Sequence, residues 1–290
     1  MPNPKHLTER IFQSPSKYIQ GPNAIKNAGQ YLKGLGNAPL LAVDAFVYKI
    51  GEYRSHGNRA YPLTYGFVAG ESLIQALKDD KFNVTHVTFG GEASAQEVTR
   101  LVDIGREKKV DFVIGLGGGK TIDTAKAVAD QLGVQVAILP TTASTDAPCS
   151  ALSVLYTPHG EFDKYTFFAK NPTIVLVDTG IAARAPARFL AAGIGDALAT
   201  NVEARRSKTS PNFGGLLPTE VSDAICRKCE EILFKYGKQA YEANKVGACT
   251  PAVEAVVEAN TLCSGLGFES GGLAAAHAVC CILEIHTSHR

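Results

Sequence analysis

The sequence predicts an α/β fold in which a parallel sheet covered by helices is followed by an all-helical part. Up to Asp178, short apolar runs alternate with helical patterns, which is the order expected of a parallel sheet. Beyond Asp178 only helical periodicity is found. Those helices are expected near 187–206, 218–237, 251–265 and 272–281.

Each predicted strand is a short apolar run between turn residues. Strands are expected over 14–21, 39–44, 84–89, 110–115, 134–139 and 174–178, with helices over 23–35, 70–80, 94–108 and 119–132 between them. Residues 151–156 and 165–168 flank a polar turn, which suggests a hairpin. We therefore expect an α/β domain over 1–180 and a helical domain over 181–290, and the stretch 51–68 follows neither pattern, so it is expected to be an atypical surface insert.

Composition restricts the classes of function. The chain has 290 residues, 45% of them hydrophobic, and a net charge of +1, so it can bury a sizeable core. This balance gives no electrostatic reason to expect nucleic acid or a membrane as partner. Neither a signal peptide nor an apolar run of about eighteen residues is found. We expect a cytoplasmic protein that acts on a small molecule.

The seven cysteines do not suggest a disulfide framework. Their number is odd and no secretory signal precedes them. Cys226 and Cys229 are spaced as a CxxC pair, but they fall on one face of a predicted helix and no second pair accompanies them. We expect them to fill space in the core rather than to bind zinc.

A glycine-rich turn connects a predicted strand to a predicted helix. Residues 115–120 read Gly-Leu-Gly-Gly-Gly-Lys and follow an apolar run. Without Cβ atoms, the backbone N–H groups and the positive end of the helix can approach a phosphate. Within the expected Rossmann-like domain, the turn therefore predicts a site for a nucleotide pyrophosphate, although its spacing is neither the Walker pattern nor GxGxxG. On this segment alone, glycines needed only for close strand–helix packing remain an alternative.

Polar residues follow two further predicted strands. The run 136–139 continues into 140–146, which reads Pro-Thr-Thr-Ala-Ser-Thr-Asp, and the run 39–43 ends in Asp44. Ligands of parallel sheets bind beyond the carboxyl ends of the strands, so we expect one crevice. A carboxylate at Asp44 would accept hydrogen bonds from ribose and repel a 2′-phosphate, which favours NAD over NADP. An ordinary turn aspartate is the alternative.

Two polar residues interrupt apolar helical runs in the second half. They are Asp196, in Gly-Ile-Gly-Asp-Ala-Leu, and His277, in Ala-Ala-Ala-His-Ala-Val. Either side chain, buried without a partner, would be strongly unfavourable. A shared divalent metal would satisfy both, whereas a helix-capping aspartate and a hydrogen-bonded core histidine are the alternatives.

The sequence resembles the polyol-oxidising branch of the iron- or zinc-dependent alcohol dehydrogenases in four ordered segments: GLGGGKTIDTAKAVA, LPTTASTDAPCSALSVLY, AAGIGDALAT and GFESGGLAAAHAV. The resemblance extends from about Ile11 to Val279. It implies NAD-dependent oxidation of glycerol to dihydroxyacetone, assisted by zinc or alternatively iron, and a possible homo-oligomer. It also implies that Asp196 and His277 are metal ligands and that Asp146 is the catalytic residue that contacts the polyol.

The same resemblance implies the cofactor contacts. They lie at the ribose position, in the glycine turn and in the segment after residue 140: Asp44, Gly117, Gly118, Gly119, Lys120, Thr121, Ile122, Asp123, Thr141, Thr142, Ala143, Ser144, Ser150, Leu152 and Tyr156. A phosphorylated polyol is a rival substrate. It would require clustered cations near Asp146 or Asp196, and the sequence shows no such cluster there.

The chain departs from the family pattern after Val279. Family members continue to a second histidine motif, which supplies a third metal ligand, and to further helices. Here residues 280–290 read CCILEIHTSHR, and a mobile His286 or His289 would be a poor replacement. We therefore expect the helical domain to be incomplete, truncated at its C-terminal end. The alternative to an active enzyme is a catalytically impaired, NAD-binding remnant of the family.

Overall fold

The computed structural model describes residues 8–48 and 69–279. The predicted insert over 51–68 and the segment 280–290 lie outside these ranges. Among the described helices, none has the length and apolar character needed to cross a membrane.

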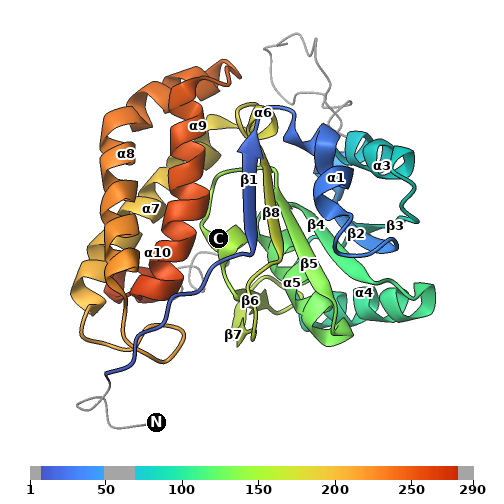
Figure 1. The fold of residues 1–290 in the computed structure, drawn as a ribbon, viewed down its shortest axis with the longest axis horizontal. Helices are drawn as coiled ribbons and strands as arrows, with labels where there is room; N and C mark the ends of the chain where they lie inside the picture. The colour runs from blue at the N-terminus through green and yellow to red at the C-terminus, as the bar shows by residue number, and fades with distance from the viewer. Residues whose placement is uncertain (1–7, 49–68, 280–290) are drawn as a thin grey trace.

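A six-stranded parallel sheet forms the centre of the first part (Figure 1). Its order is β1-β8-β5-β4-β2-β3, and every pairing is parallel. The central strands are buried along nearly their whole length, which explains their uninterrupted apolar runs. The strands are β1 (Lys17–Gly21), β2 (Pro39–Asp44), β3 (Thr85–Phe89), β4 (Phe112–Gly117), β5 (Gln135–Pro140) and β8 (Ile174–Asp178).

Helices cover both faces of this sheet. Because side chains alternate along a strand, Leu40 and Ala42 of β2 pack with α4 and α5, whereas Leu41 and Val43 pack with the helices on the other face. The helices of this part are η2 (Ala24–Asn27), α1 (Ala28–Leu32), α2 (Ala45–Tyr48), α3 (Ala69–Asp79), α4 (Ala95–Lys108), α5 (Gly119–Leu132) and α6 (Thr179–Ala182). The predicted order of strands and helices is confirmed.

A short hairpin stands beside the sheet. After the single turn η3 (Ala147–Cys149), β6 (Leu152–Tyr156) pairs antiparallel with β7 (Phe162–Phe167). The hairpin was predicted, but its second strand begins at Phe162 rather than at Tyr165. Strand β6 also lies against α5, where the Ser153 hydroxyl donates to the Asp123 carbonyl at 2.9 Å.

The second part is helical, as predicted. Its elements are α7 (Ala187–Ser207), α8 (Glu220–Lys245), α9 (Pro251–Glu258), the π-helical turn η4 (Ala259–Cys263) and α10 (Ser264–Gly271). Helix α8 runs further than the expected end at 237, since Ala240 and Asn244 continue its buried face. The helix expected over 272–281 differs too. Gly272 has a positive φ of 89°, so α10 ends there and helical residues resume only at 275.

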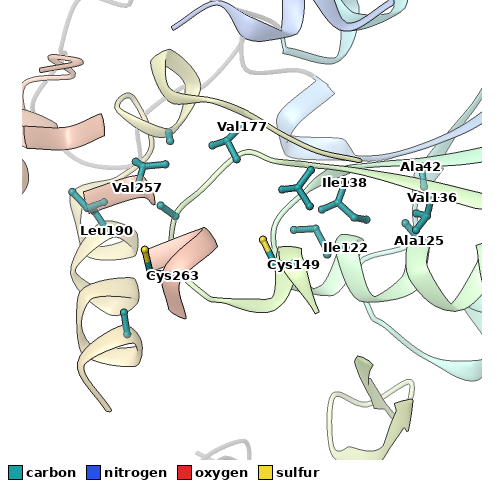
Figure 2. Close-up of a cluster of buried hydrophobic side chains, with 14 of the residues drawn as sticks. Ala42, Ile122, Ala125, Val136, Ile138, Cys149, Val177, Leu190, Val257 and Cys263 are labelled. Atoms are coloured by element: carbon teal, nitrogen blue, oxygen red, sulfur yellow. The ribbon is translucent and has the colours of Figure 1, made fainter. Parts of the chain in front are cut away.

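One hydrophobic core joins the two parts. Figure 2 shows it running from Ala42 and Ile138 in the sheet, past Cys149, to Leu190 and Val257 in the helices. The inner face of α8 contributes further buried residues, among them the free cysteines 226 and 229, which fill space as expected. Because this core is continuous, the domain boundary near residue 180 stays a prediction.

A buried lysine ties α5 to the loop after β5. Lys126 is 3% exposed. Its Nζ donates to the carbonyls of Ala147 at 2.9 Å, Ser150 at 3.3 Å and Leu152, and it forms an ion pair with Asp123 at 3.2 Å. An ammonium group tolerates burial only with such partners. Lys126 therefore fixes the loop that carries the predicted site residues 141–150.

Replacing this lysine should destabilise the protein. Lys126→Met leaves a buried carboxylate and several carbonyls without their donor, so we expect the free energy of unfolding to fall by about 3–5 kcal/mol. Urea denaturation measures it. Lys164→Met, at an exposed position in β7, is the control and should change stability by less than about 0.5 kcal/mol. Equal losses in the two variants would contradict the structural role of Lys126.

Candidate active site

Three predicted ligand-binding segments meet at the carboxyl edge of the sheet. Strands β2 and β4 are neighbours, which sets Asp44 beside the glycine turn. Strands β4 and β5 are also neighbours, and the Thr141 N–H donates to the Gly117 carbonyl at 3.0 Å. Asp44, the turn 115–120 and the loop 141–150 therefore border one region, as the sequence predicted.

The glycines of the turn fall into two groups. A Cβ added at Gly115 would lie 2.6 Å from a side-chain atom of α5, and one at Gly117 would lie 2.7 Å from another. These two glycines are required for close packing of strand and helix. A Cβ at Gly118 would meet nothing within 4 Å, so no protein atom excludes a side chain there. Packing, the alternative explanation, accounts for Gly115 and Gly117 but not for Gly118.

The first turn of α5 is suited to an anion. Gly118 is the N-cap, and no side chain caps the first N–H groups. Beside them, Lys120 pairs with Glu92 at 2.6 Å and its Nζ stands 5.0 Å from the centre of the Tyr156 ring. Ser94, not Glu92, is the N-cap of α4. The carboxylate of Glu92 instead holds Lys120 at the edge of the crevice.

Two predicted cofactor contacts do not face this crevice. Ile122 belongs to the hydrophobic core (Figure 2), and its N–H donates to the Gly118 carbonyl at 3.0 Å. The Asp123 carboxylate accepts from the Val154 N–H at 3.1 Å and pairs with Lys126. Burial raises the pKa of Asp123. Five further predicted contacts are also buried: Thr121, Thr141, Ala143, Ser150 and Leu152.

The structure brings Asp146, Asp196 and His277 together, although they come from the loop before η3, from α7 and from the helical residues 275–279. One ligand atom from each lies within 4.8 Å of the other two. Asp196 accepts from the Asp146 N–H at 3.3 Å through Oδ2, and its Oδ1 lies 3.1 Å from His277 Nε2. Asp146 is 8% exposed, while the side chains of Asp196 and His277 are 26% and 25% exposed. The cluster is therefore anchored inside and accessible on one side.

Glu203 completes the cluster, and sequence reasoning missed it. This buried residue of α7 hydrogen-bonds His277 Nδ1 through Oε2. Its spacing of seven residues from Asp196, two helical turns, places both acids on the same face of α7, but this spacing alone does not indicate the contact with His277.

The electrostatics of the cluster reflect an excess of negative charge. Burial, together with the charge of Asp196, raises the pKa of Asp146 to about 8, although Thr200 and Ser264 donate hydrogen bonds to it at 3.3 and 3.0 Å. Burial lowers the pKa of His277, but its hydrogen bonds to the two neighbouring carboxylates outweigh this effect and raise it to about 9. Both directions mean that the cluster favours a bound positive charge.

The donor set fits a divalent metal ion. Carboxylate oxygen and imidazole nitrogen are ligands that suit zinc or iron. The three ligand atoms already lie within 4.8 Å of one another, so modest side-chain movements would bring them onto one ion. The sequence assigned Asp196 and His277 to this role. Asp146, predicted as a substrate contact, belongs to the same cluster.

The fold is that of a known class of oxidoreductases. Residues 15–179 match the family model described as iron-containing alcohol dehydrogenase, and the chain belongs to this family.

Individual relatives within the family have names that are more specific than the family description. The glycerol dehydrogenase of Thermotoga maritima is 48% identical over 275 residues, which cover 94% of this chain and 70% of that protein. The glycolaldehyde reductase of Halobacterium salinarum is 43% identical, and the match covers 93% of this chain and 69% of that protein. The crystal structure of a probable glycerol dehydrogenase from Sinorhizobium meliloti superposes with a TM-score of 0.83 at 40% sequence identity. The match covers 95% of this chain and 71% of that one. The predicted resemblance and fold class are confirmed.

The two groups of glycines should respond differently to a methyl group. Gly115→Ala forces α5 away from β4, and we expect a loss of about 1–3 kcal/mol in the free energy of unfolding. Gly118→Ala meets no protein atom and keeps an accessible φ of −85°, so its loss should stay below about 0.5 kcal/mol. Urea denaturation of both variants measures the difference. A large loss at Gly118 would show that packing, not a ligand, requires that glycine.

Proposed function

We propose that this chain oxidises glycerol to dihydroxyacetone, with NAD as hydride acceptor and a metal ion, zinc or alternatively iron, bound at the acidic cluster. The observation that carries the proposal is the convergence of Asp146, Asp196 and His277 beside the open end of the glycine turn. A Cβ at Gly119 would lie only 3.6 Å from Thr145, the neighbour of Asp146. The relatives named glycerol dehydrogenase support the same reaction.

The dinucleotide would lie along the carboxyl edge of the sheet. Asp44 would accept hydrogen bonds from ribose hydroxyls. The uncapped N–H groups at the start of α5 and the Lys120 ammonium would face the pyrophosphate. Gly118 leaves the space that this approach needs. NAD, when bound, supplies the nicotinamide ring that takes the hydride from the alcohol carbon.

The residues around the cluster would handle the hydroxyl groups of the substrate. Asp196 and His277 would hold the metal ion, which, when bound, lowers the pKa of the alcohol hydroxyl. Asp146 would accept a hydrogen bond from the polyol, and the hydroxyls of Thr200 and Ser264 fix its carboxylate. The groups facing Asp146 are thus the hydroxyls of Thr200 and Ser264, the Asp196 carboxylate and His277. They suit a neutral polyol better than a phosphorylated one, which the carboxylates would repel.

The deciding experiment combines two measurements on one purified sample: bound metal per chain by elemental mass spectrometry, and NAD-dependent oxidation of glycerol. Zinc or iron near one per chain, together with turnover, would support the proposal. Retained NAD binding without metal and without turnover would contradict it and favour the catalytically impaired remnant. Glycolaldehyde with NADH, assayed in parallel, tests the substrate of the Halobacterium relative.

Changes at the metal site should lower metal content and rate together. We expect Asp196→Asn and His277→Ala to reduce zinc affinity and kcat by at least about 10–100-fold, the cost of losing even a hydrogen-bond partner of a metal ligand. Chelator competition and steady-state kinetics measure the two effects. Asp130→Asn, an exposed acid near the far end of α5, is the control. An unchanged rate in either site variant would remove the metal assignment.

Changes at the ribose and phosphate positions should act on the cofactor. Asp44→Ala is expected to raise the KM for NAD by about tenfold, equivalent to about 1.4 kcal/mol, with kcat and zinc content nearly unchanged. Gly118→Ala should raise the same constant, because its methyl group occupies the space for the pyrophosphate. Steady-state kinetics at saturating glycerol measures both. If the KM for glycerol rose instead, the placement of the dinucleotide would be wrong.

A further inference from the structure

Glu203 hydrogen-bonds His277 on the side of the ring away from Asp196. It is 4% exposed, and its two oxygens are both engaged. Oε1 accepts from the backbone N–H groups of Ala276 at 2.6 Å and His277 at 3.2 Å, while Oε2 hydrogen-bonds His277 Nδ1. One carboxylate therefore holds both the backbone and the ring of His277.

The segment that carries His277 depends on α7 for its position. Gly272 ends α10, so the helix before the segment does not determine where it lies. Two residues of α7 do so instead: Ser207 donates to the Leu273 carbonyl at 3.1 Å, and Glu203 accepts from the N–H groups further along. The same helix carries Asp196. One helix thus supplies one candidate metal ligand and the anchor of the other.

The hydrogen bond to Glu203 decides which ring nitrogen of His277 is available. An ionised carboxylate only accepts, so Nδ1 carries the proton of this hydrogen bond. The lone pair of a neutral ring is then on Nε2, which lies 3.1 Å from Asp196 Oδ1. A protonated ring donates from Nε2 to Asp196, whereas with a neutral ring two acceptors face each other at this distance and a cation can lie between them. This arrangement matches the general pattern in which a metal-binding histidine donates its other N–H to a carboxylate.

We propose that Glu203 is a positioning residue that holds His277 in the Nδ1-protonated tautomer and presents Nε2, opposite Asp196, to a divalent metal ion. Glu203 itself does not contact the metal. The inference rests on the metal site of the proposed function and adds to it a residue whose removal impairs metal binding without removing a ligand.

Glu203→Gln tests the proposal. Glutamine has the same shape, and its oxygen still accepts from the two backbone N–H groups. Its amide nitrogen, however, donates to Nδ1, which places the ring proton on Nε2 and blocks the metal. We expect the affinity for zinc alone, measured by competition with a chromophoric chelator, to fall by about 10–100-fold. The urea midpoint of metal-free protein should stay near that of the wild type. Glu231→Gln, an exposed glutamate of α8, is the matched control and should change neither quantity.

Glu203→Asp separates hydrogen bonding from packing. It keeps a carboxylate acceptor and loses one methylene, so it should retain more zinc affinity than Glu203→Gln. A Gln variant that binds zinc like the wild type would overturn the proposal. So would a zinc affinity that falls only in proportion to the stability of the metal-free protein, or an Asp variant weaker than the Gln variant. If Glu203→Gln does not fold, the Asp variant decides alone: it must bind zinc within about tenfold of the wild type.

The outcomes also separate this inference from the proposed function. Wild-type protein that binds zinc but does not oxidise glycerol would contradict the proposed reaction and leave the role of Glu203 to be judged by zinc affinity. Wild-type protein that binds no zinc would overturn both. Zinc binding with turnover that is unaffected by Glu203→Gln would overturn the role of Glu203 alone.

Discussion

The loop after β5 must be held in place by buried polar contacts, and the candidate site depends on this constraint. Lys126 holds its carbonyls from the side of the sheet. From the helical side, Asn260 Nδ2 donates to the Ala143 carbonyl at 2.9 Å, and Ser264 donates to Asp146. Because unpaired carbonyls and carboxylates are costly when buried, these donors restrict the loop to one conformation. The junction of the two parts is therefore polar at its centre, although an apolar core surrounds it.

Two local irregularities make this junction possible. The π-helical turn η4 interrupts the path from α9 to α10 and places Asn260 and Ser264 against the loop; π-helical turns are common at functional sites. Helix α7 comes equally close, since a Cβ at Gly193 would lie 2.0 Å from the Ala143 carbonyl oxygen. Gly193, the first glycine of the Gly-Ile-Gly-Asp run, is therefore required for steric reasons. It lets α7 approach the loop so that Asp196 reaches Asp146.

The sequence predicted the fold well where local pattern and burial agree. Strands 39–44 and 174–178 and helix 119–132 match their observed bounds, because strands buried on both faces read as apolar runs and glycines mark both ends of that helix. It failed where the chain breaks its own pattern, as at Gly272 and η4. Asp196 and His277 could be predicted because each stands out in an apolar run. The function of Glu203 depends on a residue 74 positions away, and no local pattern encodes such a contact.

Two residues of the cluster lie on the same helix, α7, and this affects how the cluster can move. Asp196 and Glu203 are fixed on one rigid helix, and Glu203 carries His277 with it. When α7 moves as a body, the three shift in concert and their mutual separations are preserved. Asp146 belongs to the opposite side of the junction. A shift of α7 against the sheet would therefore disturb the hydrogen bonds that join Asp196 and Thr200 to Asp146 before it changed the spacing of Asp196, Glu203 and His277.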